Sequence, residues 1–324
     1  MPAQHKVNAC VPASLCYNNL SSNGRHFAFA HATEAALCAA DGSGKPTLLK
    51  DRANSAVTHV RFIKLAGGVE LLVVLSGRSA IFFSADGARE LHTLHMAEGR
   101  PAASFFRGVA TVKAGGSSYL YVGSSGSGDL HCCAADPATS KLCNLALATA
   151  LENVCTGPIS DMDGSVEGIL AIAAGTDKPD GSSEIILAEI GTDGAPLATM
   201  RLTAEAPELC TSLRIRGRTM LAAYSTGRVR VFDVDAKRCV AVVAAHARWI
   251  NALEVHPGRG IFACASEDGY VSVWDLEPGR RVKHRAHLAA ANHVLTGVAF
   301  VGNSVAATAY DVSSLLTWSL GSAE

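Results

Sequence analysis

Residues 246–275 contain three short apolar runs separated by turn signals. The first run, residues 250–255, ends just before Pro257, which has no backbone N–H to offer a neighbouring strand. The second run, residues 261–264, is followed by an Asp-Gly pair typical of two-residue hairpin turns. In the third run, residues 270–274, valines alternate with Ser and Trp, as in a half-buried strand. We therefore expect three consecutive antiparallel strands that end on a Trp-Asp pair.

Similar strand endings recur on either side of this stretch. Phe232-Asp233 lies 42 positions before Trp274-Asp275, and Trp318 lies 44 positions after Trp274. A period of about 40–45 residues with a Trp-Asp ending is typical of the four-stranded blades of a β-propeller. A chain of 324 residues holds about seven such units. We therefore predict an all-β, seven-bladed β-propeller that forms one domain over residues 1–324.

Seven units can be laid along the chain between Asp-Gly and other turn signals. The units between residues 103 and 202 are the least regular, and residues 148–158 are expected to form a loop because they show no alternation. The expected strands, unit by unit, are 14–20, 26–31, 36–40 and 47–50; 57–65, 69–75, 80–84 and 90–95; 103–106, 119–122, 129–133 and 142–146; 159–163, 169–173, 184–190 and 197–202; 211–215, 220–224, 228–234 and 239–243; 250–255, 261–264, 270–274 and 281–284; and 295–301, 305–309 and 315–320.

The seventh unit has only three strands before the sequence ends. A ring with an unpaired strand edge would invite pairing with other chains. Residues 5–11 precede the first unit and have no other evident partner. We therefore predict that residues 5–11 supply the outer strand of the last blade and close the ring.

Composition excludes several classes of protein. The formal net charge is −1, which argues against a general nucleic-acid binder, because such proteins carry a strongly basic surface. No apolar run approaches the roughly 20 residues of a membrane helix, and the N-terminus lacks the apolar core of a signal peptide. We therefore expect a cytoplasmic protein whose ten cysteines are free thiols, with cytoskeletal or ciliary association through partners left open.

The blade at residues 245–275 resembles those of WD-repeat β-propellers, and the chain resembles the WD repeat-containing protein 54 family in particular. The matching segments are LCYNNLS at 15–21, AAYSTG at 222–227, the blade itself and GNSVAATAYD at 302–311. The resemblance implies a single propeller that holds other proteins and has no known reaction. It also implies a structural hydrogen-bond tetrad of His246, Asp268 and Trp274, with Cys264 at the position that usually carries Ser or Thr. Because a thiol is a weak donor, we expect this tetrad to be incomplete.

Three motifs that could carry chemistry have simpler explanations. His131-Cys132-Cys133 offers metal-ligand types, but adjacent strand residues point to opposite faces and no second pair follows at zinc spacing. The glycine-rich segment 123–128 lacks the Lys and helix of a phosphate loop and contains Gly-x-Ser-x-Gly letters without a strand-to-helix setting. Asp161, Asp163, Asp177 and Asp180 lack the spacing of a calcium loop. We expect no metal, cofactor or catalytic residue.

The candidate partner-binding residues lie in the fifth and sixth units. Trp249 is placed near the rim of the ring beside Arg248, and a Trp–Arg pair is typical of binding hot spots. The alternative is that Trp249 packs under a neighbouring loop. Arg228 and Arg230 alternate on one strand, where they form either a solvated face or a site for an acidic partner segment.

These features favour a non-catalytic scaffold of the WD-repeat type that binds partner proteins or peptides on the propeller faces. The alternative is an enzyme or small-molecule binder that uses the central channel. That alternative requires carboxylates or histidines on the inner strands, which we expect to carry mainly apolar and small residues.

Overall fold

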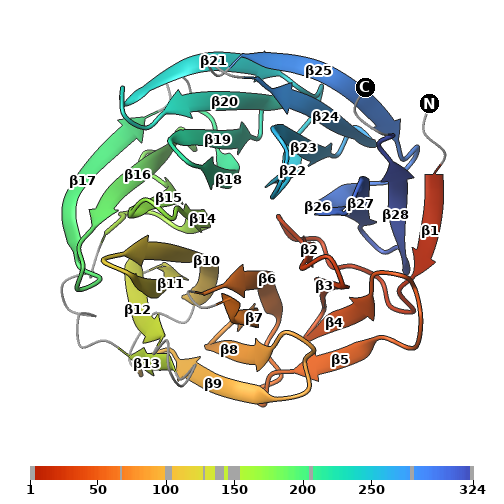
Figure 1. The fold of residues 1–324 in the computed structure, drawn as a ribbon, viewed down its shortest axis with the longest axis horizontal. Helices are drawn as coiled ribbons and strands as arrows, with labels where there is room; N and C mark the ends of the chain where they lie inside the picture. The colour runs from red at the N-terminus through yellow and green to blue at the C-terminus, as the bar shows by residue number, and fades with distance from the viewer. Residues whose placement is uncertain are drawn as a thin grey trace.

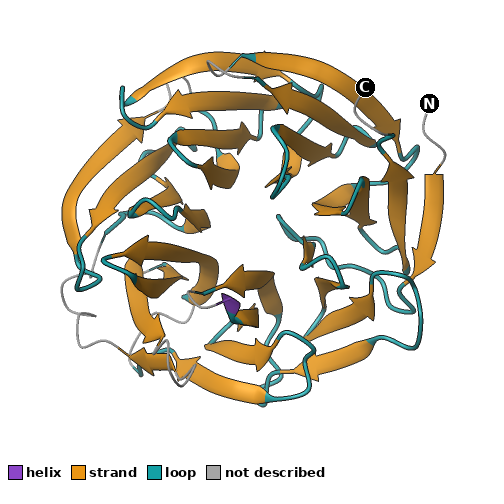
Figure 2. Ribbon diagram, in the orientation of Figure 1, coloured by secondary structure: helices purple, strands orange, loops and turns teal. Residues whose placement is uncertain are grey.

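Seven four-stranded antiparallel sheets form a closed ring around a central axis (Figure 1). The computed structural model describes residues 4–65, 68–98, 104–126, 128–135, 142–144, 154–203, 207–277 and 281–321. No α-helix occurs within these ranges, which consist almost entirely of strands and loops (Figure 2). The predicted all-β, seven-bladed propeller is therefore confirmed.

Each blade runs from an inner strand at the channel to an outer strand at the rim. Blade one is β2 (Ser21–Ser22), β3 (His26–His31), β4 (Glu34–Ala39) and β5 (Thr47–Lys50); blade two is β6 (Val57–Lys64), β7 (Glu70–Ser76), β8 (Ser79–Ser84) and β9 (Glu90–His95); blade three is β10 (Phe105–Ala114), β11 (Ser117–Ser125), β12 (Asp129–Ala135) and β13 (Leu142–Asn144); blade four is β14 (Ile159–Gly164), β15 (Ile169–Gly175), β16 (Ser183–Ile190) and β17 (Pro196–Thr203). Blade five is β18 (Cys210–Arg216), β19 (Thr219–Tyr224), β20 (Arg228–Asp233) and β21 (Arg238–Ala244); blade six is β22 (Ile250–Val255), β23 (Ile261–Ser266), β24 (Tyr270–Leu276) and β25 (Val282–Ala289); blade seven is β26 (Leu295–Val301), β27 (Ser304–Ala309), β28 (Ser314–Ser319) and β1 (Gln4–Asn8).

The N-terminal strand closes the ring, as predicted. β1 pairs antiparallel with β28, with Lys6 opposite Leu316 (Figure 1). The strand covers residues 4–8 instead of the predicted 5–11. It ends there because Cys10 adopts a left-handed backbone with φ of 60°, which a strand does not tolerate.

Apolar layers between adjacent blades form the core. Between blades six and seven, for example, Val271 and Val273 lie in one cluster with Val298, Leu316 and Trp318. The alanine-rich runs, which taken alone favour a helix, form buried second strands in which small side chains let the blades approach closely.

Besides β1, three inner or outer strands differ most from their predicted bounds. The predicted strand 14–20 is not a strand, because its backbone groups bond to other blades, and β2 is only Ser21–Ser22. β10 runs on to Ala114 and β25 to Ala289, both beyond the expected ends. Most of the predicted loop 148–158 lies outside the described residues, and so does the end of the predicted strand 142–146.

Candidate functional site

Six of the inner strands carry a β-bulge near the start, and each follows the same local pattern. An apolar residue comes first, two residues that include the bulge follow, and the next residue is again apolar. A bulge redirects a side chain that regular pleating would place on a blade face. Each bulge carries a polar residue, and five of the six side chains reach the next blade, the exception being Thr296; the residues are Thr58, Arg107, Ser160, Thr211, Asn251 and Thr296.

These side chains form a belt of hydrogen bonds around the channel. Most of them donate directly to a backbone carbonyl of the following blade, whereas Thr296 acts through the hydroxyl of Thr308. The bonds are Thr58 Oγ1 to Phe106 O (2.6 Å), Arg107 Nε to Ser160 O (3.1 Å), Ser160 Oγ to Cys210 O (2.6 Å), Thr211 Oγ1 to Ile250 O (2.7 Å), Asn251 Nδ2 to Leu295 O (2.7 Å) and Thr296 Oγ1 to Thr308 Oγ1 (3.1 Å). The belt therefore links blades two to seven in sequence, and the bond from Thr308 Oγ1 to Asn19 O, at 2.9 Å, joins blade seven to residues that precede blade one.

Residues 14–19, which we call the plug segment, complete the belt and cross the channel. The N–H of Asn19 donates to Thr296 O of blade seven, and the N–H of Asn18 donates to Asn251 O of blade six, each at 2.9 Å. The Asn18 side chain reaches blade five, where Oδ1 accepts from Ser212 Oγ and Nδ2 donates to Thr211 O. Asn18 and Asn19 are both almost fully buried. The plug segment thus occupies space that an open channel would offer to a small molecule.

A layer of charged side chains lies below the belt, contrary to the expectation that inner strands carry mainly apolar and small residues. Arg61 pairs with Asp163 at 2.7 Å. Arg214 pairs with Asp161 at 2.7 Å and with Glu254 at 3.1 Å. The sequence analysis named Asp161 and Asp163 only as unsuitable calcium ligands and did not foresee their ion pairs, because their partners Arg61 and Arg214 lie on other blades far away in the sequence. Only the repeat of bulge positions would have revealed that they meet at the axis.

The environment of this layer fixes the protonation states of its members. Burial is the largest single influence on the pKa of Asp161 and would raise it, but Arg214, neighbouring groups that include Arg61, and the backbone N–H of Leu213 together outweigh burial, and the pKa lies below the usual value. Burial, assisted by the charge of Arg107, lowers the pKa of His59 to about 3, so that this imidazole is neutral at pH 7. Asp161 is therefore an ion-paired carboxylate and His59 a neutral side chain.

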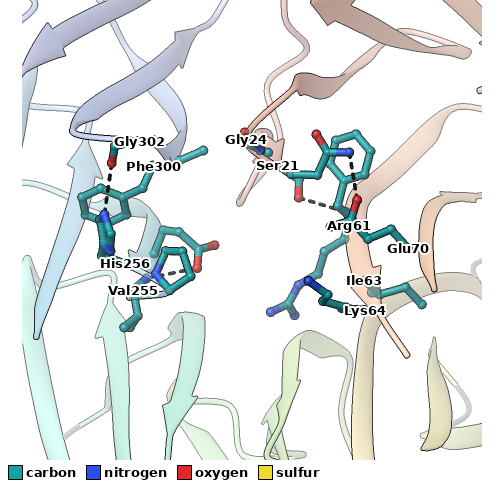
Figure 3. Close-up of a pocket in the computed structure, with 16 residues that line it drawn as sticks. Ser21, Gly24, Arg61, Ile63, Lys64, Glu70, Val255, His256, Phe300 and Gly302 are labelled. Atoms are coloured by element: carbon teal, nitrogen blue, oxygen red, sulfur yellow. Dashed lines mark hydrogen bonds between the residues drawn. The ribbon is translucent and has the colours of Figure 1, made fainter. Parts of the chain in front are cut away.

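The channel has a hollow at each end. One, with a volume of about 420 Å³, is lined by residues from β6, β22 and β26 and is called the lower hollow (Figure 3). Arg61 and Lys64 extend into it from β6, across from Val255 and His256 (Figure 3). The other, of about 460 Å³, is called the upper hollow and is lined mainly by apolar side chains, including those of Leu15, Tyr17 and Phe105.

The structural relay of blade six runs through Ser272, a residue that sequence analysis did not select. His246 Nδ1 lies 3.0 Å from an Asp268 oxygen, and His246 Nε2 lies 2.8 Å from Ser272 Oγ. Trp274 Nε1 donates to the same hydroxyl at 2.9 Å. Cys264 of β23, which the sequence analysis placed in the tetrad, pairs with Ser272 of β24 and is fully buried. The hydroxyl therefore takes the place assigned to the thiol.

The candidate partner-binding residues fall in different settings. Arg248 is exposed, and the half-buried Trp249 stacks on Tyr17 of the plug segment with a centroid distance of 6.0 Å. Arg230 is not available to a partner, because it is buried, bonds to Glu208 and lies over the ring of Tyr224. Arg228 is exposed and lies 4.0 Å from Glu208.

The motifs set aside as chemical sites have structural roles in the described residues. Cys132 and Cys133 are buried, and burial raises the pKa of Cys132 to about 11. Asp161 and Asp163 belong to the ion-paired layer, whereas Asp180 accepts a turn hydrogen bond from the backbone of Ser182. Within the described ranges, no group of three or more His, Cys, Asp or Glu side chains is arranged to hold a metal ion. The part of the chain that the structure describes holds no helix long and apolar enough to cross a membrane.

The ring of four-stranded blades, together with the His-Ser-Trp relay and its Trp-Asp ending, defines a WD-repeat β-propeller. The chain belongs to the WDR54 family, which it matches over residues 12–320. WD repeat-containing protein 54 of Mus musculus is 31% identical over 115 residues, which are 33% of this chain and 34% of that protein. The Homo sapiens protein of the same name is 30% identical over 118 residues, 34% of this chain and 35% of its own length. The aligned part is thus about a third of each relative.

Solved structures share the fold at low sequence identity. A chain in the crystal structure of a mitotic checkpoint complex superposes with a TM-score of 0.72 at 13% identity, covering 99% of this chain and 96% of its own length. The WD40 repeats of RRP9 superpose with a TM-score of 0.69 at 13% identity, covering 98% of both chains.

Proposed function

We propose that this chain is a non-catalytic scaffold, a single propeller domain over residues 1–324 that acts in the cytoplasm by binding other proteins on its faces. The observation that carries the proposal is the closed channel. The plug segment crosses it, and Arg61, Asp161, Asp163 and Arg214 engage one another below. The charged groups of the channel are therefore committed to holding the ring together, and the loops on its two faces are left to bind ligands.

The shape of the molecule supports this role. A belt that links blades two to seven, together with the plug segment, makes the faces rigid, so that a partner meets a surface organised in advance. Structural neighbours that are components of protein complexes support the same reading. The alternative, a small-molecule binder or enzyme in the channel, would require the plug segment to leave its hydrogen bonds with blades five, six and seven.

Affinity capture followed by mass spectrometry tests the proposal. The immobilised full chain should retain a reproducible set of proteins that added soluble chain displaces. Trp249→Ala should reduce that set if the face carrying the upper hollow is used, whereas Tyr270→Ala, a substitution of an exposed aromatic on β24, serves as the control. Retention of no protein beyond those bound by an unrelated propeller would contradict the scaffold role.

A further inference from the structure

The upper hollow combines apolar walls with polar atoms that lack partners. Leu15, which is 61% exposed, stands at its edge, and Phe105 and Ile159 line it. The polar residues in its lining include Arg107, Asn251 and Glu267. An apolar hollow with a few polar groups of fixed orientation is the usual form of a binding site.

Asn251 presents an acceptor that nothing in the described residues satisfies. Its Nδ2 donates to Leu295 O at 2.7 Å, which fixes the orientation of the amide. Oδ1 is consequently the free atom, and it is buried without a hydrogen-bond partner among the residues described, as is Ser125 Oγ in the same lining. Leaving a buried acceptor unsatisfied is unfavourable, so the hollow is suited to a ligand that brings a donor.

Glu267 adds a negative charge to the lining of the same hollow. Its backbone N–H donates to Trp249 O at 3.0 Å, which places it next to the start of β22, the strand that carries Asn251. Its carboxylate forms no ion pair within the described parts of the chain. Arg107 also lines the hollow, but each of its nitrogens already donates to a carbonyl, those of Ser160, Thr58 and Tyr17. The hollow therefore leaves to a ligand two acceptors, Asn251 Oδ1 and the Glu267 carboxylate, and the Ser125 hydroxyl, which can donate or accept.

Exposed apolar side chains continue from the hollow toward blade seven. Tyr310, 50% exposed, forms a β-bridge with Ala13, two residues before Leu15. The N–H of Tyr310 donates to the carbonyl of Val294, which is 38% exposed. Leu15, Val294 and Tyr310 thus lie on neighbouring loops of one face. An extended segment that starts in the hollow can place further apolar side chains along them.

We propose that the upper hollow binds an extended segment of a partner protein in which a Lys or Arg is flanked by large apolar side chains. The cation lies between the Glu267 carboxylate and Asn251 Oδ1, and the apolar neighbours pack on Leu15 and Phe105. This inference rests on the proposed scaffold function and specifies the partner's chemistry. The lower hollow is a poorer candidate, because its carboxylates already pair with arginines: Glu70 with Arg25 and Glu254 with Arg214.

Defined peptides test this site without a known partner. Fluorescein-labelled peptides with the centres Leu-Arg-Leu, Leu-Glu-Leu and Ser-Arg-Ser, each between Gly-Ser flanks, are titrated into the full chain and followed by anisotropy. The Leu-Arg-Leu peptide should bind at least about tenfold more tightly than either of the others, because only it satisfies both the acceptors and the apolar walls. Equal binding of the Leu-Arg-Leu and Leu-Glu-Leu peptides, or binding of none of the three, would overturn the proposal.

Variants of Glu267 locate the binding. Glu267→Gln should weaken Leu-Arg-Leu binding about tenfold, and Glu267→Lys should shift the preference to Leu-Glu-Leu. Glu277→Gln, a substitution at an exposed position just after β24, is the matched control and should change nothing. Unchanged Leu-Arg-Leu affinity in Glu267→Gln refutes the site. If whole proteins are still captured by that variant, the scaffold function stands and only this assignment of the partner segment fails.

Discussion

The Oδ1 atom of Asn18 accepts a 2.6 Å hydrogen bond from the hydroxyl of Ser212, a residue 194 positions further along the chain. This contact spans the channel, from the plug segment before blade one to the inner strand of blade five. Together with the bond from the Asn18 N–H to Asn251 O, it joins the start of the ring to blades in its second half. The plug segment is therefore a clamp on the ring.

We expect Asn18→Ala to lower the free energy of unfolding by about 1–3 kcal/mol, because Ser212 Oγ and Thr211 O lose a buried partner. Urea unfolding at pH 7 measures the change. Part of any effect could come from the left-handed backbone of Asn18, whose φ is 54°. Asn54→Ala controls for this, since Asn54 is exposed and has a φ of 52°. Equal losses in the two variants would assign the effect to backbone strain alone.

The relay of blade six yields a second prediction. Ser272→Ala should destabilise the protein by about 1–3 kcal/mol, because Trp274 Nε1 and His246 Nε2 both lose their partner. Cys264→Ala removes only a small buried group, so that its cost should be smaller, near 1 kcal/mol. Thermal unfolding of the two variants and the wild type compares them. A larger loss for Cys264→Ala would return the thiol to the central place in the relay.

The strand pattern of the sequence was sufficient to predict the propeller. Alternation, turn residues and the spacing from Phe232 to Trp274 to Trp318 are local signals, and each blade repeats them. The closing strand followed from counting, since seven blades left one edge open. The plug segment could not be predicted from local signals. Residues 15–20 have the apolar content of a strand, but their hydrogen bonds to Thr296, Asn251 and Ser212, which lie far along the chain, hold them in another conformation.

The site was less accessible from sequence, because its geometry depends on bulges. A regular strand would place Ser160 and Asp161 on opposite faces, but the register shift between Ile159 and Asp161 turns Ser160 toward the next blade. Ser272 was overlooked for a similar reason. In the sequence, Ser272 showed only the alternation of a strand. In the structure, it pairs with Cys264 on β23, and its hydroxyl lies between His246 and Trp274.

The neutral, buried His59 predicts a pH dependence of stability. Its pKa is lowered to about 3 in the folded protein, whereas an unfolded chain has a histidine pKa of about 6.5. The stabilisation is therefore complete above pH about 6.5 and is lost as the pH falls toward 3, since only the unfolded state takes up the proton. The slope from this residue approaches about 1.4 kcal/mol per pH unit within that window.

His59→Gln should flatten the dependence between pH 6.5 and 4, as measured by urea unfolding at a series of pH values. His5→Gln is the control: His5 is exposed on β1, so that its surroundings change little on unfolding. If His59→Gln retained the full wild-type slope, other groups would have to account for the loss of stability in acid.

Deleting residues 1–8 should expose the outer edge of blade seven. Most side chains of β1 are exposed, so that the strand contributes chiefly through backbone pairing with β28. Its removal leaves the edge of β28 unpaired above the buried Leu315 and Trp318, and an unpaired edge recruits other strands. We expect a lower melting temperature and concentration-dependent association, measured by calorimetry and by size-exclusion chromatography with light scattering.

Lys6→Ala, which keeps the backbone pairing, should remain monodisperse to the same extent as the wild type. A truncated chain that melts and elutes like the wild type would show that blade seven is stable with three strands, and the closure would then contribute little to the fold.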